Sequence, residues 1–212
     1  MLSDFLVAVR LAETMCARIC HDLGGPLGTV DACLELIGEG ATDTETVAAA
    51  DAAAKVLEAR LRLLRAAWGP HPAALTLADL HDLAAGLPQA RKLTLDTDRL
   101  PQDARFAAGI GRALAAVLLL AAQALPKGGR ISLLGTVEDV LIRIAGPQAA
   151  WPGALAAALH DAVALEPLLA QPRELALVMA VLIARTEGLR LSILVMAGDG
   201  TGPSPLRLCA AS

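Results

Sequence analysis

Apolar residues recur in alternating steps of three and four along two long stretches in the first third of this 212-residue chain. In the first stretch they are Cys16, Cys20, Leu23, Leu27, Val30, Leu34 and Ile37. In the second they are Val47, Ala50, Ala54, Leu57, Leu61, Leu64 and Trp68. This spacing is typical of helices that pack against each other at a shallow angle. It predicts two long helices, the first beginning near Ser3 or Asp4 and ending around residues 38–40.

A short turn separates the two expected helices, with Thr42 and Thr44 as candidate N-caps for the second. The pair therefore forms an antiparallel hairpin. One hairpin cannot bury a continuous apolar stripe by itself, whereas two hairpins related by a twofold axis bury it in a four-helix bundle. Residues 1–69 are predicted to be this helical domain, and the protein is predicted to be a homodimer.

The segment Gly69-Pro70-His71-Pro72 ends the second helix, because proline cannot continue a helix and disfavours helical geometry in the residue before it. Residues 73–212 then mix helical and strand patterns. Helices are expected over 76–86, 102–125, 149–169 and 172–186, and strands over 92–96, 130–136, 140–145, 189–196 and 206–209. Helices packed against a mixed sheet form an α/β sandwich, so the fold class is an α-helical hairpin followed by an α/β domain.

Composition excludes several classes of function. The net charge is −4 and aromatic residues make up 2% of the chain, which argues against nucleic acid as a partner. Despite a mean hydropathy of +0.55, the longest uncharged apolar runs, 113–122 and 175–184, are about half the ~20 residues of a membrane span. We expect them to be buried helices and expect no membrane association. The cysteines lie mostly within one apolar helical pattern and no signal peptide is recognisable, which predicts a reduced, cytoplasmic protein.

His21 is the strongest candidate for chemistry. It follows Cys20 by one position, which turns it about 100° from the apolar stripe and toward solvent. A neutral imidazole can accept a phosphoryl group on one ring nitrogen while a carboxylate, here Asp22, hydrogen-bonds to or deprotonates the other. Arg18, one helical turn earlier, is placed to contact the phosphoryl oxygens. We predict His21 and Asp22 to be the catalytic pair.

Three glycines and a proline follow His21 within the same predicted helix. Each glycine costs about 1 kcal/mol relative to alanine in a helix interior, and proline costs about 3. Clearing side chains around the imidazole lets a large, flat partner surface approach it, and the proline bends the helix just beyond the site. The residues expected to contact the partner or its phosphoryl group, beside Arg18, are Ile19, Leu23, Gly24, Gly25, Pro26 and Gly28.

The stretch Arg18-Ile19-Cys20-His21-Asp22-Leu23-Gly24-Gly25-Pro26-Leu27 resembles the H-box of sensor histidine kinases. In that box an acid follows the phosphorylated histidine, and proline and a hydrophobe follow five residues later. Residues 112–131 are similar to the helix, turn and strand that carry the Asn box of kinase ATP-binding domains, and 142–148 and 171–177 correspond to the later boxes. Leu120 or one of its neighbours stands in place of the magnesium-ligating Asn, Ala145 replaces the adenine-reading Asp, and the lid segment lacks glycine.

A phosphoacceptor hairpin followed by a kinase-like domain without its ATP boxes resembles the bacterial histidine phosphotransferases of the ChpT type. The resemblance implies a degenerate GHKL sandwich over 73–212 that binds no ATP, no metal and no other cofactor. It also implies a shuttle, in which His21 accepts a phosphoryl group from the receiver domain of a hybrid histidine kinase and passes it to response-regulator receivers. Magnesium belongs to the receiver. Gly25 stands where kinases with phosphatase activity usually carry a polar residue, so autonomous phosphatase activity is not expected.

Two other functions compete with the shuttle. A dimeric scaffold would bind receivers without using His21. A metal-dependent phosphohydrolase would use the pair His21-Asp22 together with His81-Asp82 and His160-Asp161 as ligands. Cys16 and Cys20 are expected to pack in the bundle rather than bind zinc, and residues 198–203 are expected to be a turn rather than a phosphate loop.

Overall fold

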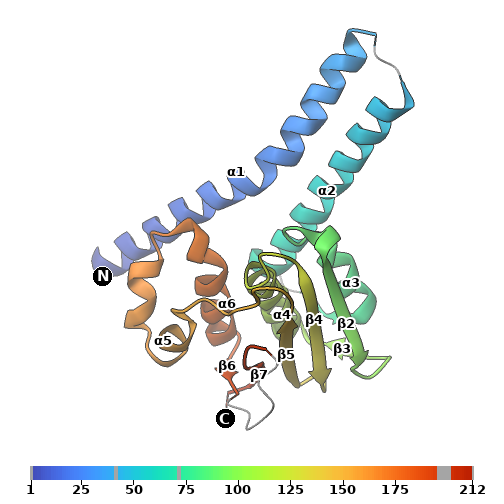
Figure 1. The fold of residues 1–212 in the computed structure, drawn as a ribbon. Coiled ribbons are helices and arrows are strands. Elements are labelled where there is room, and N and C mark those ends of the chain that lie inside the picture. Colours follow the sequence, from blue (N-terminus) through green and yellow to red (C-terminus); the bar gives the residue numbers. More distant parts are fainter. Residues whose placement is uncertain (1, 41–42, 71–72, 195–201, 212) are drawn as a thin grey trace.

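The computed structural model describes residues 2–40, 43–70, 73–194 and 202–211. A hairpin of two long helices, α1 (Leu2–Gly38) and α2 (Thr44–Trp68), rises from a domain of helices and strands (Figure 1). This arrangement confirms the predicted fold class, a helical hairpin followed by an α/β domain. The N-cap of α2 is Asp43 rather than Thr42 or Thr44, and its Oδ1 accepts a hydrogen bond from the Thr46 N–H at 2.8 Å.

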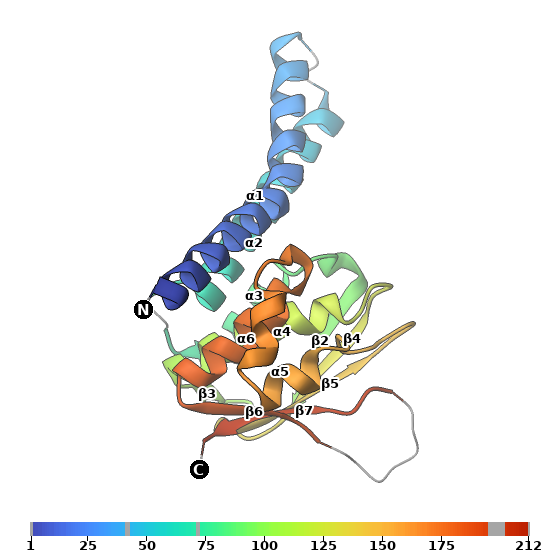
Figure 2. The ribbon, with the colours of Figure 1, turned by 90° about the vertical axis from the view of Figure 1, so that its left-hand side faces the viewer.

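Proline interrupts α1 without ending it. Pro26 lies inside the helix, and Figure 2 shows the helix changing direction near the middle of its length. A proline at this position removes one backbone hydrogen bond and crowds the preceding turn, which bends a helix. Pro26 stands five residues after His21, where the sequence predicted a bend.

The second unit is built on a five-stranded sheet with the order β2-β4-β5-β7-β6. Strand β2 runs parallel to β4, and the other neighbours are antiparallel. The strands are β2 (Leu93–Arg99), β4 (Gly129–Gly135), β5 (Asp139–Ala145), β6 (Leu189–Ile193) and β7 (Leu206–Ala210). A second, two-stranded sheet pairs β1 (Leu75–Thr76) with β3 (Arg105–Phe106).

Helices cover one face of the large sheet (Figure 2). They are α3 (Leu77–Ala84), α4 (Ala108–Gln123), α5 (Leu155–His160) and α6 (Leu175–Thr186), with short 3₁₀ helices η1 (Ala90–Lys92), η2 (Val163–Leu168) and η3 (Pro172–Glu174). The uncharged runs 113–122 and 175–184 are buried in α4 and α6, as expected, except for the partly buried Leu182. Among the described residues, no helix is both long and apolar enough to cross a membrane.

The hairpin and the sheet domain share one core. Leu63, Leu64 and Ala67 near the end of α2 belong to the same buried cluster as α4 and α6. Thr14 of α1 donates a buried hydrogen bond of 2.6 Å to the carbonyl oxygen of Leu169. The base of the hairpin is therefore fixed to the sheet domain by apolar packing and by a satisfied buried polar contact.

Two predicted helices differ from the structure. Residues 149–169 form two short helices instead of one, because Asp161 ends α5 by accepting a hydrogen bond from the Val163 N–H at 2.9 Å. The helix expected to begin at Gln102 begins at Ala108, after strand β3. The end of the strand expected over 189–196 and most of the turn expected over 198–203 lie outside the described residues.

Candidate functional site

His21 is the most exposed group of the candidate site. Its side chain is 84% exposed, and its Nδ1 lies 3.2 Å from Asp22 Oδ1. A carboxylate accepts hydrogen bonds, so this pair places the ring proton on Nδ1. The lone pair of the neutral ring is then on Nε2, the nitrogen that an exposed side chain can offer to a reactant. This geometry suits nucleophilic attack from Nε2.

Asp22 joins His21 to Arg18. Its side chain is only 9% exposed, and its second oxygen, Oδ2, accepts a hydrogen bond from Arg18 Nε at 2.8 Å. Arg18 Nη1 also lies 3.4 Å from the carbonyl oxygen of Pro172 in η3. Arg18, which we expected to face phosphoryl oxygens, is thus held by Asp22 and directed toward the sheet domain. The three residues form one hydrogen-bonded chain along α1.

The glycines after His21 face open space. A Cβ atom built at Gly24, Gly25 or Gly28 meets no heavy atom within 4 Å. Packing within this chain therefore does not require glycine at any of the three positions. The glycines lower the stability of the helix, and no contact within the single chain requires them. This supports the expectation that a partner surface approaches here.

Ile19 and Leu23, two apolar residues of the expected docking surface, are partly covered. Ile19 and Leu23 are half-buried and pack against the core cluster. They lie on the face of α1 that is turned toward α2 and the sheet domain. The surface around His21 is consequently made of the glycines and charged groups more than of apolar side chains.

Arg60 of α2 is a residue that the sequence analysis missed. It is 9% exposed, and its charge interacts with those of Asp22 and Arg18 across the hairpin. Burial lowers the pKa of its guanidinium below the ordinary arginine value, and the Asp22 carboxylate opposes that shift. A signal for it existed: Arg60 stands three residues after Leu57 and four before Leu64, so a charge interrupts an apolar helix face.

The other histidine-aspartate pairs lie on separate elements. His81 is on α3, with its Nε2 3.0 Å from Thr97 Oγ1, and His160 is on α5. Over the ranges that the structure describes, no three His, Cys, Asp or Glu side chains come together in a group able to hold a metal ion. Cys16 and Cys20 are exposed in the single chain, while Cys33 is buried.

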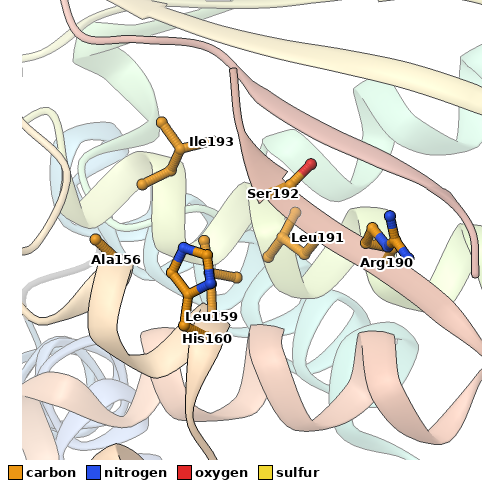
Figure 3. Close-up of a pocket in the computed structure, with 7 residues that line it drawn as sticks. All are labelled: Ala156, Leu159, His160, Arg190, Leu191, Ser192 and Ile193. Carbon is orange, nitrogen blue, oxygen red and sulfur yellow. The ribbon is translucent and has the colours of Figure 1, made fainter. Parts of the chain in front are cut away.

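His160 lines a pocket at the edge of the large sheet (Figure 3). The pocket has a volume of about 550 Å³ and lies between α5 and β6. Its lining residues are Ala156, Leu159, His160, Arg190, Leu191, Ser192 and Ile193. None of them belongs to the hairpin, so this pocket is separate from the site around His21.

The segments expected to correspond to the kinase ATP boxes include α4, the end of β5, and η3 with the start of α6. Leu120 is fully buried in α4, and Ala145 ends strand β5. Residues 171–177 form η3 and the first turn of α6. The amide of Gln123, near the end of α4, donates to the carbonyl oxygen of Arg173 in η3. This contact ties η3 to α4, beside the Pro172 carbonyl that faces Arg18.

Comparisons with known proteins agree with this architecture. Residues 77–198, more than half of the chain, match the family described as the histidine phosphotransferase C-terminal domain. Protein phosphotransferase ChpT of Brucella abortus (strain 2308) is 39% identical over 64 residues, which are 30% of this chain and 31% of that protein. The match therefore spans about a third of that relative's length.

A solved structure described as a bacterial phosphotransferase has the same fold. It superposes with a TM-score of 0.66 at 22% sequence identity, covering 95% of both chains. The likeness thus extends over the hairpin as well as the sheet domain, which the family match alone does not cover. By the match of its sheet domain, this chain belongs to the histidine phosphotransferase family.

Proposed function

We propose that this protein is a phosphorelay histidine phosphotransferase in which His21 carries the phosphoryl group. One observation carries the proposal: His21 projects from α1 almost fully exposed, with Nδ1 engaged by a buried carboxylate. The family to which the sheet domain belongs supports the class of activity. The phosphoryl donor is the aspartyl phosphate of a hybrid kinase receiver domain, and the final acceptor is the aspartate of a response-regulator receiver.

The proposed phosphoryl transfer needs only His21 and the phosphorylated aspartate of the receiver as reactants. The Nε2 lone pair attacks phosphorus, the bond between phosphorus and the aspartyl oxygen breaks, and its electron pair leaves with the receiver's carboxylate. The ring then carries a positive charge, with the proton still on Nδ1. Asp22, which accepts from Nδ1, stabilises that charge. Transfer to the next receiver reverses these events, and magnesium enters with the receiver.

The surface for the receiver is proposed to surround His21 on α1. Gly24, Gly25 and Gly28 leave open space there, and Arg18 and Asp22 lie beside it. Gly25 offers no polar side chain to orient a water molecule, so we propose transfer between receivers rather than autonomous hydrolysis.

The sheet domain is proposed to have lost nucleotide binding. A buried leucine at position 120 offers no oxygen for a magnesium ion that accompanies ATP. The domain instead supports α1 through the core it shares with α2. A calorimetric titration with MgATP is expected to give no heat of binding above that of dilution, and micromolar affinity would overturn this part of the proposal.

The proposed active form is a homodimer. Apolar and small side chains at intervals of seven residues remain exposed on the outer face of the hairpin. They are Cys20, Leu27 and Leu34 on α1, and Val47, Ala54 and Leu61 on α2. A second copy of the hairpin is the proposed cover, which completes a four-helix bundle.

The decisive experiment follows a radiolabelled phosphoryl group from a phosphorylated receiver, with magnesium, to the wild-type protein and to H21A. A matched control is H160A, which removes another exposed histidine, in the sheet domain. We expect label on wild type and H160A only, and we expect it to be stable in alkali and lost in acid. Label on H21A would place the phosphoryl group elsewhere. Receiver binding without label on any form would identify a scaffold.

A further inference from the structure

Arg60 is a buried charge that the hairpin does not need for packing. It lies 9% exposed on a helix face shared with Leu57 and Leu64, and its Nε is buried without a hydrogen-bond partner among the described residues. Burial of a guanidinium is unfavourable unless other charges compensate for it. A leucine or methionine at this position would fill the helix interface without that penalty. The charge therefore requires an explanation outside packing.

The hairpin geometry places Arg60 level with Asp22. Asp22 lies 16 residues before Gly38, the end of α1, and Arg60 lies 16 residues after Thr44, the start of α2. Antiparallel helices with the same rise per residue bring such positions to the same height above the turn. Both side chains are about nine-tenths buried, on neighbouring helices, and their charges interact. Arg60 therefore stands level with the Asp22 carboxylate, on the opposite helix of the hairpin.

The site holds two guanidinium groups for one buried carboxylate. The oxygens of Asp22 are already engaged, Oδ1 by His21 Nδ1 and Oδ2 by Arg18 Nε. Arg18 is part-exposed and its other contact, to the Pro172 carbonyl, is long at 3.4 Å. A phosphoryl group on His21 would compete with Asp22 for Arg18, because it is a strong acceptor with two negative charges. Asp22 would then keep the hydrogen bond from His21 Nδ1 on Oδ1, and its Oδ2 would lose the charged partner that Arg18 supplies unless Arg60 replaces it.

We propose that Arg60 is a positioning residue, which keeps Asp22 against His21 Nδ1 when Arg18 turns toward the phosphoryl oxygens. The proposal rests on the phosphotransfer function proposed for His21. It assigns the two arginines different tasks: Arg18 is exchanged between Asp22 and the phosphoryl group, and Arg60 holds the charge of Asp22 throughout. Arg60 acts through Asp22 and does not touch the phosphoryl group.

The first test observes the His21 ring in the unphosphorylated protein and requires no transfer. Nitrogen-15 NMR at a pH of about 9, where a histidine ring is neutral, distinguishes the Nδ1–H from the Nε2–H tautomer. We compare wild type with R60M, which removes the charge at similar length, and with R60K, which keeps it. The matched control is R62M, on the same helix but exposed and paired with Glu58. R60Q replaces R60M where thermal denaturation finds that variant unfolded.

We expect mainly the Nδ1–H tautomer in wild type, R60K and R62M, and a mixture of tautomers in R60M. Single-turnover transfer from a phosphorylated receiver should then be slowed in R60M by about tenfold to 100-fold at saturation, the scale on which small misplacements of catalytic groups act. The receiver concentration at half-maximal rate should change little. R60K should restore most of the rate.

The outcomes separate the two proposals. If R60M keeps the wild-type tautomer and rate, or if R60K loses as much as R60M, Arg60 is structural and the positioning role is wrong. If the tautomer changes in R60M while the wild-type protein accepts no label from any receiver, Arg60 positions Asp22 but the phosphotransfer function fails. If R62M changes the tautomer and the rate as much as R60M does, the loss of any positive charge on α2 explains the effect, and the proposal is wrong.

Discussion

At the scale of single residues, the surroundings of each histidine-aspartate pair decide its chemistry. In the pair at 21 and 22 the carboxylate faces the ring at 3.2 Å. In the other pairs the groups have different partners: the ring of His81 pairs with Thr97, and the carboxylate of Asp161 accepts from the Val163 N–H. The dipeptide is the same in all three places, so only the fold distinguishes the pair that can prepare an imidazole for nucleophilic attack.

Substitution D22N tests the role of the carboxylate directly. The amide keeps the size of the side chain but removes the negative charge that opposes the charge on the phosphorylated ring. We expect the rate of label acquisition to fall by about 100-fold or more, since removing the carboxylate that orients a catalytic histidine costs about 10⁴ in a serine protease. D82N, on α3, is the control and should react like wild type. A D22N protein that accepts label at the wild-type rate would show that Asp22 is dispensable.

Residue patterns alone could select His21 and Asp22 as the candidate pair because residue type and spacing carry the proposed chemistry, and the structure adds their 3.2 Å contact. They offered a charge on an apolar helix face as the signal for Arg60, but its proposed role depends on which residue of the opposite helix lies at the same height, which residue patterns do not show. They also placed Ile19 and Leu23 on the open surface, although both are half-buried against the core. A heptad pattern shows that a face is apolar, but it does not say whether the second helix, the sheet domain or another molecule covers it.

At the scale of elements, the glycines after His21 make α1 less stable next to the site than alanines would. Replacing Gly24 and Gly28 by alanine should raise the free energy of unfolding by about 1 kcal/mol at each position, the difference in helix propensity. The added methyl groups meet only open space within the chain. In the proposed complex they lie between His21 and the receiver, so the double variant should need a higher receiver concentration for half-maximal transfer. Chemical denaturation and transfer kinetics measure the two effects.

Gly38 provides the control for the expected effect of the glycine substitutions on receiver docking. It ends the same helix, and a Cβ there also meets no atom within 4 Å. G38A should therefore leave transfer unchanged, whatever it does to stability. If the double variant is more stable and transfers as well as wild type, the glycines do not serve receiver docking.

The first turn of α3 introduces a pH dependence of stability. Thr76 and Asp79 form a capping box, and hydrogen bonds from the Thr76 N–H and hydroxyl lower the pKa of the Asp79 carboxyl below its ordinary value of 3.8. A carboxyl whose pKa is lower in the folded state stabilises the fold above its ordinary pKa. That contribution to stability is lost as the pH falls below 3.8 and through the lower pKa that Asp79 has in the folded protein.

Substitution D79N should accordingly destabilise the protein at pH 6 and have a smaller effect at pH 3 or below. Urea denaturation of both forms at the two pH values gives the comparison. D82N, on the same helix outside its first turn, should show no such change between the two pH values. An equal cost of D79N at both values would mean that the cap does not depend on the ionised carboxylate.

The sequence predicted strongly periodic elements well and weakly periodic ones badly. The pair β4 and β5 and the helix before β6 lie close to where alternation, a tight turn and Gly188 placed them. The stretch 149–169 is apolar enough to suggest one helix, but the turn at Asp161 divides it into α5 and η2. Local hydrogen bonds of an aspartate outweighed apolar content there.

At the scale of the whole molecule, the seven-residue pattern serves two interfaces. Leu64 of α2 faces the shared core, whereas Leu61, from the same seam, is exposed. On α1, Cys33 is buried and Leu34 beside it is exposed. Leu64 joins the hairpin to its own sheet domain, whereas Cys33 is buried outside that shared core. The outer ones remain for a second molecule, and the separation of 1–69 from 73–212 as independent domains stays a prediction, since one core includes both.

A charge on the exposed outer face of the hairpin should dissociate the proposed dimer. Leu34 is 57% exposed in the single chain, so L34E should leave the fold of the monomer intact while placing a carboxylate at the apolar centre of a four-helix bundle. Light scattering after size exclusion should give twice 21.8 kDa for wild type and 21.8 kDa for L34E. V163E, at an exposed apolar residue of η2 away from the hairpin, should remain dimeric.

A wild-type protein that is monomeric at micromolar concentration would contradict the proposed homodimer, and a different partner would then have to cover the exposed outer face of the hairpin. Because His21, Asp22 and Arg60 all belong to one hairpin, monomeric L34E should still show the wild-type tautomer of His21, and any loss of transfer in that variant would then come from docking.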